Sequence, residues 1–580
     1  MRVLDDRWVI VLAAATVAGA SLPAGIPWPV PALAIAISML GRARLGLVVC
    51  FFVLASALAH DHARAVVAID PGPFESSVAL VTDPIRSAGG VRVDVMVDGV
   101  RYEAAGWGAA GARLRDRLAG EHVELIGTVR SVGDDPYRLR RGVDGVISVD
   151  TVGSWSSAGG PSGAANMVRR LLAAGAEPLP LDDQALFLGI VFGDDREMSV
   201  VVKDDFRAAG LTHLVAVSGQ NVAFVLALAG PVLRRLQVHS RWALTLALLG
   251  FFGLVTRFEP SVVRATAMAG VAATATLLGR ESSATRSLGL AISGLILLDP
   301  GLISSLGFRL SVAATMGILW ISPGLARMFP GPRVVRETSA ITVGAQLAVA
   351  PMLVTTFGSV PVASVPANLL AGPAAGPVMI WGLSGGLVAG LVGGTVGTVL
   401  HWPTGLLTRW MRWVARLAAV APFGQLTPVP LMAATIAVTF LLVGRHRRTA
   451  AAVAIAFLLL PSVDIIAAGD GRADPTAGVA IWRAEGVTVV EVDGSATAAR
   501  ALAALRTEGI RSVDMVVAHE DGRRVAEVLA AVGRRHRIVA IVTASGSERD
   551  WLSLGDGEQV GIGPVVISAV GGDLVVAWAS

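Results

Sequence analysis

The sequence contains a single cysteine, Cys50, which excludes a disulfide within the chain, so every exported part must fold by packing alone. It also contains a single lysine, Lys203, and arginine carries the remaining positive charge apart from histidine. No stretch has the spacing G-x-x-x-x-G-K-[ST], which excludes a P-loop nucleotide site and therefore ATP hydrolysis by that route.

Charged residues are scarce as well, at 16% of the chain against 53% hydrophobic, and this balance excludes a soluble globular protein of 580 residues. Apolar stretches occur at 9–24 and 45–59, and then almost continuously over 211–468. Because one membrane span needs roughly 20 apolar residues, the sequence predicts about ten membrane helices. Acidic residues near the N-terminus argue against a cleavable signal peptide, so the first apolar runs are expected to be anchors.

Arginine-rich loops set the expected orientation. A further apolar run follows Pro27-Trp28-Pro29, and Arg42 and Arg44 lie between it and the run at 45–59. An Arg-His-Arg-Arg loop at 445–448 precedes the last run. If both loops are cytoplasmic, as the positive-inside rule expects, the helices that follow them lead outward. The segments after these helices are then two soluble domains on the same exterior face.

The sequence thus predicts a polytopic α-helical membrane protein with an exterior β-barrel domain and a C-terminal α/β domain. Acidic residues slightly outnumber arginines in both soluble domains, so the basic excess lies in the membrane-rich parts. The expected divisions are N-terminal transmembrane helices at 1–62, an exterior domain at 63–155, a linker at 156–180, a transmembrane body at 181–470 and a C-terminal domain at 471–580.

The exterior domain is predicted to be all-β, with strands beginning at Val91, His122 and Gly145. Short strands at this spacing fit a small barrel of the oligonucleotide-binding (OB) type. Aromatic rings beside arginines suit stacking on single-stranded bases. The candidates stand in a turn-rich loop at 133–142: Tyr137, Arg138, Arg140 and Arg141. Equally open is a structural interpretation, in which the rings fill the barrel and the arginines form a solvated loop.

The stretch 206–225, FRAAGLTHLVAVSGQNVAFV, starts amphipathic and then enters a long apolar run. Four polar side chains stand at or inside that run: His213, Ser218, Gln220 and Asn221. An unpaired polar group in hydrocarbon is costly, so such groups normally face protein or a water-filled path.

Further polar side chains stand in separate apolar runs: Arg264, Arg309, Gln346 and Asn368. Arg264 lies near the start of its run, where it either snorkels to the interface or lines a path. At mid-helix, Arg309 facing lipid would cost at least about 2.5 kcal/mol, so it is expected to pair with Asp299 or to line a conduit. Asn368 lies between two prolines, and broken helices are tolerated at depth only against protein or water. This recurrence favours a lined pathway, with all eight residues as pathway or gating groups.

Four blocks of sequence follow one another across roughly residues 181–381: GLTHLVAVSGQNVAF, EPSVVRATAMAGVAATATLLGR, LLDPGLISSLGFRLSVAATMGI and AQLAVAPMLVTTFGSVPVASVPANLLAGP. In this order they resemble the competence domain of the ComEC family of DNA-uptake channels. The segment containing DPYRLRRG resembles the family's exterior OB-type domain, and the order of the domains is similar as well. One departure is Asn221, where many relatives have histidine.

The resemblance implies a multi-pass channel in a bacterial plasma membrane that passes one strand of incoming DNA into the cytosol during natural transformation. Arginine binds phosphates through bidentate hydrogen bonds, which makes Arg264 and Arg309 the candidates for such contacts. Without a nucleotide site of its own, the chain is expected to depend on a cytosolic helicase-type motor and on a DNA-delivery receptor outside. Its other expected partners are single-stranded DNA and membrane lipid.

The C-terminal domain departs further from the family. AIWRAEGVTVVEVDG resembles the start of a metallo-β-lactamase-like domain, and VDMVVAHEDGRR falls where such domains place the metal motif H-x-H-x-D-H. His519 stands at the first position, but the later ligand positions hold Asp521, Arg523 and Arg524. A weak site of His519, Glu520 and Asp521 stays open as an alternative. Because fixed positive charge replaces ligands, we expect a degenerate, shortened domain with no metal, no cofactor and no enzyme activity.

Two other functions remain open on the sequence. The polar residues suit a small-solute permease equally well, although the two halves of the body show no inverted repeat. A membrane-anchored, metal-dependent nuclease would use the C-terminal domain, and the missing ligands argue against it.

Overall fold

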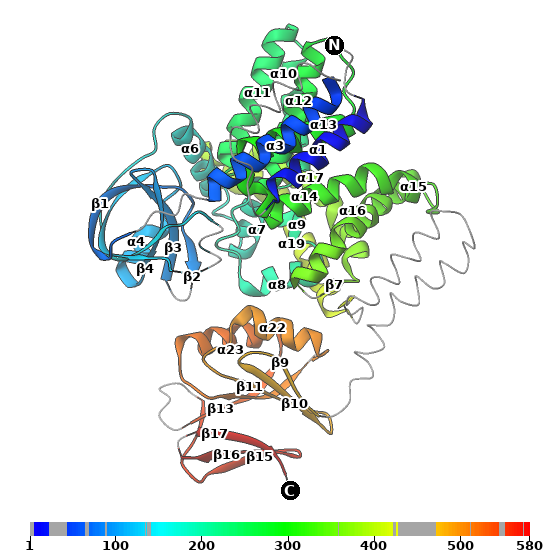
Figure 1. Ribbon diagram of the computed structural model, residues 1–580. Helices are drawn as coiled ribbons and strands as arrows, with labels where there is room; N and C mark the ends of the chain where they lie inside the picture. Colours follow the sequence, from blue (N-terminus) through cyan, green and yellow to red (C-terminus); the bar gives the residue numbers. More distant parts are fainter. Residues whose placement is uncertain are drawn as a thin grey trace.

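A computed structural model of the protein shows a helical body with a barrel-like β domain at one side. An α/β domain lies below the body in the view of Figure 1. The second N-terminal apolar run with Arg42 and the last expected span with its arginine loop lie outside the described residues. The structure describes residues 5–22, 43–63, 69–87, 90–133, 135, 138, 141–357, 359–421, 425–426, 471–510, 512–544, 551–571 and 573–579.

The barrel-like domain closes because β1 pairs with both β5 and β3, in the order β1-β5-β6-β4-β3. Its elements are β1 (Gly72–Leu80), β2 (Ile85–Ser87), β3 (Gly90–Val97), β4 (Val100–Gly106), α4 (Gly108–Arg115), β5 (His122–Ser131) and β6 (Gly145–Ser156). Alternate residues such as Val93, Val95, Leu125 and Ile147 fill the interior and are at most 1% exposed. The three strands predicted from the sequence, β3, β5 and β6, are confirmed.

Within the described residues, the helical body combines two N-terminal helices with a longer series after the barrel. The first part is α1 (Asp6–Ala20) and α3 (Ala43–Ala63). The second part is α6 (Gly160–Gly175), α7 (Leu181–Phe192), α8 (Val200–Ala208), α9 (Thr212–Val215), α10 (Gly219–Leu233), α11 (Val238–Val255), α12 (Pro260–Leu277), α13 (Ala284–Leu298), η1 (Pro300–Ser304), α14 (Leu306–Met316), η2 (Gly317–Ile321), α15 (Ser322–Ala326), α16 (Arg333–Phe357), α17 (Ser364–Trp381), η3 (Gly382–Gly386), α18 (Leu387–Val392) and α19 (Gly394–Val420). A short strand pair joins β7 (Val360–Pro361) to β8 (Gln425–Leu426).

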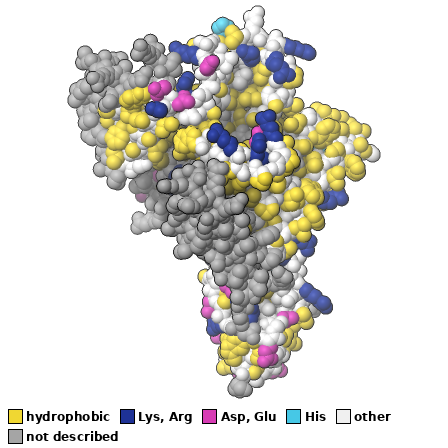
Figure 2. Space-filling view, turned by 90° about the vertical axis from the view of Figure 1, so that its right-hand side faces the viewer, with side chains coloured by type: hydrophobic (Ala, Val, Ile, Leu, Met, Phe, Trp, Pro, Cys, Tyr) yellow, Lys and Arg dark blue, Asp and Glu magenta, His cyan; other side chains and the backbone are white. Residues whose placement is uncertain are grey.

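Within the described residues, five helical segments are long and apolar enough to cross a membrane: Thr212–Leu233, Val238–Val255, Leu306–Ala326, Arg333–Phe357 and Ser364–Val392. Hydrophobic side chains cover much of one face of the helical body (Figure 2). The protein is therefore a multi-pass membrane protein, as predicted. The expected number of about ten spans includes apolar runs outside the described residues.

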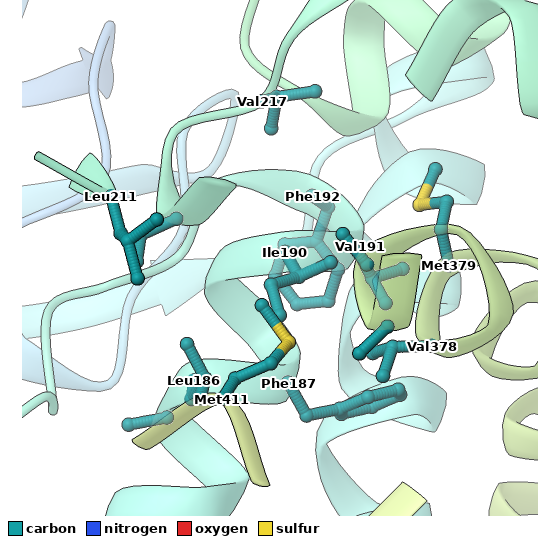
Figure 3. Packing of buried hydrophobic residues seen from close by; sticks show 14 of the residues in the cluster. Leu186, Phe187, Ile190, Val191, Phe192, Leu211, Val217, Val378, Met379 and Met411 are labelled. Atoms are coloured by element: carbon teal, nitrogen blue, oxygen red, sulfur yellow. The ribbon is translucent and has the colours of Figure 1, made fainter. Parts of the chain in front are cut away.

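The core of the helical body lies where α7 meets α17 and α19 (Figure 3). Phe187 of α7, Met379 of α17 and Met411 of α19 are fully buried there. Leu211 and Val217 bring the segment before α10 to the same core. Burying a side chain of this size stabilises the fold by about 1.5–3 kcal/mol, so this core fixes the start of α10 relative to α7 and α17.

The C-terminal domain has three layers. A six-stranded sheet, parallel from β11 through β14, lies between two helices and a three-stranded sheet (Figure 1). Alternate residues of the central strands point to opposite layers, as Val490 and Val489 do. The elements are β9 (Gly471–Thr476), β10 (Val479–Ala484), β11 (Val487–Val492), α22 (Ala498–Thr507), β12 (Val513–Ala518), α23 (Arg523–Arg535), β13 (Ile538–Ala544), β14 (Leu552–Leu554), β15 (Gln559–Ile562), β16 (Val565–Val570) and β17 (Asp573–Trp578).

The segment from the end of α7 through α8 contacts both soluble domains. Glu197 accepts hydrogen bonds from Arg86 at 2.9 Å and from Arg115 at 2.6 Å, and both arginines belong to the barrel. At the other end of the segment, Asp204 accepts a hydrogen bond from Arg506 of α22 at 2.5 Å. The two soluble domains therefore lie against one connected segment of the body.

A buried ionic network, the Asp83 network, joins the barrel to the body: Asp83, Arg169, Asp194, Arg196 and Arg257. Arg169, which is 4% exposed, contacts Asp83 at 2.6 Å and Asp194 at 3.1 Å. Arg257 contacts the same Asp83 at 2.8 Å. Burial alone raises the pKa of Asp83, but the charges of Arg169 and Arg257 outweigh it and lower the pKa to about 2.

Candidate functional site

One cavity of about 2260 Å³ extends from the helical body to the C-terminal domain, and we call it the central cavity. Its walls come from α10, α12, α14, α16 and α17, and from the end of α22. Two of the predicted pathway residues, Asn221 and Arg309, do not line it. The structure brings the other six together on its wall: His213, Ser218, Gln220, Arg264, Gln346 and Asn368.

The SGQN cluster forms the start of α10. Ser218 is the N-cap, and its hydroxyl accepts a hydrogen bond from the backbone N–H of Gln220 at 3.3 Å. The same hydroxyl donates to the Oδ1 atom of Asn221 at 3.2 Å. The amide Nδ2 of Asn221 donates to the carbonyl of Ile190 at 2.7 Å. Asn221 is therefore a buried tie between α10 and α7, while Ser218 and Gln220 face the central cavity.

Arg264, in the second turn of α12, is a nearly buried cation, with 7% of its surface exposed. Its Nε donates to the hydroxyl of Ser311 on α14 at 2.8 Å, and Nη1 lies 3.1 Å from the sulfur of Met268. Within the described residues, no carboxylate lies at ion-pair distance from it. A buried charge without a counter-charge is unfavourable. The site therefore suits an anion in the cavity.

Gly219 makes room for this guanidinium. A Cβ atom at this position would lie 2.7 Å from the Nη2 atom of Arg264 and 3.2 Å from the Cβ of Ala265. Arg264 therefore lies directly against the first turn of α10, whose free N–H groups and helix dipole favour negative charge. Together, the arginine and the helix start form a site of positive potential.

Other helices also begin at the wall of the central cavity. Pro260 opens α12, Gly307 lies in the first turn of α14, and Ser364 opens α17, and all three line the cavity. The hydroxyl of Ser261 donates to the carbonyl of Val217, which holds the start of α12 beside the segment before α10. Each helix N-terminus carries a partial positive charge, so these starts add to the positive potential.

His213, Gln346 and Asn368 supply polar groups to the same wall. His213 is exposed to the cavity on α9 and shares a hydrogen bond with the side chain of Asn368. The Nδ2 atom of Asn368 donates to the carbonyl of Ser364 at 2.9 Å. Gln346 is half-buried in the middle of α16. These three residues, which come from separate apolar runs, therefore line the same cavity.

Arg309 differs from the sequence-based expectation. Its side chain is exposed, while its neighbours Leu310 and Ser311 line the central cavity. It forms no ion pair with Asp299, whose carboxylate instead accepts from the backbone of Gly301 at 2.9 Å. The physical reason is position: α14 begins at Leu306, so Arg309 lies in the first helical turn, from which a long side chain reaches water.

The charged side chains among the described residues of the cavity wall are mainly basic. Three of the arginines were not predicted from the sequence as pathway residues. Basic side chains are Arg207, Arg264, Arg506 and Arg535, and the acid is Glu259. Arg506 and Arg535 come from the C-terminal domain, more than 200 residues along the chain from Arg264. Sequence spacing carries no signal for that approach. Arg207, next to the motif of the first block, was detectable as an exposed cation of an amphipathic helix.

The arginines of the barrel loop bind carboxylates. Arg138 contacts Glu103 at 3.0 Å, and Arg141 contacts both Glu103, at 2.8 Å, and Asp94. These two carboxylates are only 1% exposed and lie opposite each other in the β3–β4 register. Ion pairing therefore gives both arginines a structural role. The two other candidates of this loop, Tyr137 and Arg140, lie outside the described residues.

The suspected metal loop follows β12. His519 donates its backbone N–H to the carbonyl of Val492 at 3.1 Å, which places it at the carboxyl edge of the parallel sheet. The carboxylate of the neighbouring Asp493 accepts hydrogen bonds from the backbone N–H of Ser495 at 2.7 Å and from its hydroxyl at 2.6 Å. In the part of the chain that the structure describes, no group of three or more His, Cys, Asp or Glu side chains is arranged to hold a metal ion.

Known proteins resemble this chain over its helical body. A family model described as Competence protein matches residues 190–448. The chain is 26% identical over 197 residues to the ComE operon protein 3 of Bacillus subtilis (strain 168), which covers 34% of this chain and 25% of that protein. It is 26% identical over 260 residues to the competence protein ComA of Neisseria gonorrhoeae, and this match covers 42% of this chain and 37% of that protein. It is also 27% identical over 210 residues to the uncharacterized protein YcaI of Escherichia coli (strain K12), with coverage of 34% and 28%.

The chain thus spans between 25% and 37% of the length of these relatives. No solved structure matches the chain. The matched residues 190–448 contain the helices from α10 to α19, and with them most of the wall of the central cavity. The resemblance to competence proteins of the ComEC family that the four sequence blocks predicted is confirmed over these residues.

Proposed function

We propose that the protein is a channel in the plasma membrane of a bacterium and passes one strand of DNA into the cytosol during natural transformation. The observation that carries the proposal is Arg264, a buried cation on the cavity wall with no carboxylate partner in the described structure. It lies against the start of α10, and such a site is suited to a phosphate group. The competence family of the chain supports DNA as the source of that phosphate.

The size and charge of the central cavity favour a polymer over a small solute. Its volume of about 2260 Å³ exceeds the roughly 300–1,000 Å³ of common small-molecule pockets. Arg207 and Arg264 line it and form no ion pair with a described residue, so they offset the repulsion between successive phosphates. His213, Gln220, Gln346 and Asn368 supply neutral hydrogen-bonding groups, which suit a ligand that must move on rather than stay bound.

The barrel takes part in the proposal as an OB-type domain outside the membrane. The closed pairing of five strands supports this assignment. Arg138 and Arg141 keep 33% and 25% of their side chains exposed beside the buried carboxylates, so phosphates can reach them from solvent. Tyr137 and Arg140 complete the candidate DNA contact of this domain.

The proposed channel depends on other proteins for its driving force. The chain has no P-loop, so a cytosolic helicase-type motor would pull the strand, and a receptor outside would deliver it. Deleting the gene tests the function as a whole. We expect transformants with marked linear DNA to vanish, growth to stay normal, and the intact gene to restore uptake. Normal transformation together with a defect in solute uptake would instead identify a permease.

Gly219→Ala is expected to lower transformation while the protein still folds. The new Cβ would meet the Nη2 atom of Arg264 at 2.7 Å, and the flexible guanidinium would move away from α10. A displacement of about 1 Å at such a site costs roughly 10- to 100-fold in rate. Gly230→Ala on the same helix is the matched control, because its Cβ would lie 3.6 Å from the nearest atom. Equal transformation by the two variants, at equal protein levels, would contradict this geometry.

We propose that the C-terminal domain is not an enzyme. Dialysis of the full chain against zinc or manganese is expected to leave well under one bound ion per chain, because Arg523 and Arg524 replace ligands. His519→Ala is expected to leave the metal content unchanged. Stoichiometric metal that His519→Ala removes, together with DNA cleavage, would instead establish a nuclease.

A further inference from the structure

The C-terminal domain supplies part of the wall of the central cavity. Arg506 and Thr507, at the end of α22, line it, as do Arg535 and His536 at the end of α23. The helical layer of this domain thus faces the body at α8, while its two sheets lie farther away (Figure 1). The C-terminal domain, whose described residues contain no group arranged to hold a metal ion, therefore lies directly beside the proposed path.

Four side chains, the α8 cluster, hold the domain to the body: Asp204, Asp205, Arg506 and Arg535. Asp204 contacts Arg506 at 2.5 Å and Arg535 at 2.6 Å, and its side chain is 1% exposed. Arg535 also lies 2.8 Å from Asp205. The cluster contains two negative and two positive charges, so separation leaves two carboxylates on the body and two guanidinium groups on the domain without these counter-charges.

The attachment at α8 combines these ion pairs with an apolar contact. Val201 of α8 is a partly buried hydrophobic residue that packs against the core of the C-terminal domain. The two carboxylates are adjacent in sequence, and burial raises the pKa of Asp205 to about 6 against the opposing charge of Arg535. Keeping both carboxylates of α8 ionised in this buried position therefore costs free energy. This cost favours a contact that can be exchanged for another partner over a permanent one.

Carboxylate and phosphate groups compete for arginine because both accept two parallel N–H···O bonds from a guanidinium. Arg207 adds positive charge to the same cavity wall, since it is exposed on α8, lines the central cavity and forms no ion pair with a described residue. A polyanion that reaches the α8 cluster would therefore meet arginines whose present partners are carboxylates of the same protein.

We propose that Arg506 and Arg535 form a phosphodiester-binding site at one end of the central cavity, and that a DNA strand occupies it by displacing Asp204 and Asp205. The C-terminal domain then separates from α8 while DNA is bound and returns to it afterwards. This inference rests on the proposed function, since it requires a polyanion in the cavity. It assigns a role in transport to a domain whose hydrolase motif has been lost.

Hydrogen exchange of the full chain in lipid nanodiscs tests the proposal, with a 20-nucleotide oligothymidylate as the probe. At saturating oligonucleotide we expect the amides of α8 and α22 to exchange roughly tenfold faster, because their docked contact is lost. Asp204→Asn combined with Asp205→Asn should produce the same acceleration without DNA. Polyglutamate of matched charge should have a smaller effect, because it lacks phosphodiester groups.

The outcomes separate this inference from the proposed function. If the oligonucleotide binds, as fluorescence anisotropy of the same sample would report, and exchange in α8 and α22 stays unchanged, the inference is wrong and the channel remains. If no oligonucleotide binds, both are wrong. An equal response to polyglutamate would overturn the phosphodiester assignment.

A control variant guards against general loosening of the fold. Asp183→Asn removes a carboxylate with similar burial, since Asp183 is 1% exposed and lies 2.9 Å from Arg412. It belongs to α7 and does not line the central cavity. Exchange in α22 should stay at its original rate in this variant, and an acceleration equal to that of the α8 variant would contradict the specific role of the α8 cluster.

Discussion

Replacement of Arg264 by alanine is expected to lower the transformation frequency roughly 30-fold or more. The variant removes the buried cation that faces the central cavity and leaves Ser311 without its donor. Loss of one partner of a buried charged contact costs about 2–5 kcal/mol, which corresponds to that factor or a larger one. Transformation with marked DNA, at protein levels checked in isolated membranes, measures the effect.

Arg309→Ala is the matched control for this prediction, because it removes the same side chain from an exposed position outside the cavity. We expect it to change transformation by no more than about twofold, as surface substitutions have small effects. Arg264→Lys should restore only part of the activity, since lysine keeps the charge but loses the bidentate geometry. Equal losses from Arg309→Ala and Arg264→Ala would exclude the central cavity as the path of the strand.

Polar residues inside separate apolar runs line one cavity in the structure, for a physical reason. Such residues must find water or protein partners, so His213, Gln346 and Asn368 converge on one wet space although they belong to separate runs. Asn221 obeys the same rule in another way, since the carbonyl of Ile190 satisfies its amide. The sequence shows that a partner is needed but not whether the partner is water or a neighbouring helix.

Helix boundaries explain the error at Arg309. The sequence places it between apolar residues on both sides, which suggested a position in mid-membrane. Ser305 caps α14 just before it, accepting a hydrogen bond from the backbone of Phe308 at 3.3 Å. A serine at this spacing is an N-cap indication that the sequence does contain. A helix start predicted at Ser305 places Arg309 in the first turn of α14.

The ion pairs of the barrel loop were also within reach of the sequence. Asp98 and Gly99 both have positive φ, 47° and 82°, in a two-residue turn between β3 and β4. An Asp-Gly turn of this kind fixes the register, which places Asp94 opposite Glu103. Two adjacent buried carboxylates require cations, and Arg101 of β4 supplies one at 2.7 Å from Asp94, while Arg138 and Arg141 of the loop at 133–142 supply others. The approach of the C-terminal domain to α8, by contrast, spans about 300 residues and has no local pattern to reveal it.

Arg169→Ala is expected to loosen the barrel from the body more than any other single change in the described ion pairs. Arg169 is 4% exposed and joins Asp83 to Asp194, so its removal leaves two buried carboxylates with fewer counter-charges. Breaking a buried pair in this way costs about 3–5 kcal/mol. The rate of hydrogen exchange of the barrel strands in detergent measures how far the barrel has loosened from the body. Arg333→Ala is the control, since its pair with Glu337 is a surface pair and contributes about 0–1 kcal/mol.

The same network predicts how the attachment depends on pH. The pKa of Asp83 falls from 3.8 to about 2 in the folded protein, so its ionised form is stabilised by folding. The contribution is therefore complete above about pH 4 and is lost as the pH falls through about 2; the shift corresponds to about 2 kcal/mol. Asp83→Asn should be less stable than the original chain at pH 7 and should lack this acid-dependent step. A barrel that stays attached equally at pH 7 and pH 2 in both proteins would show that packing, and not the Asp83 network, holds the two domains together.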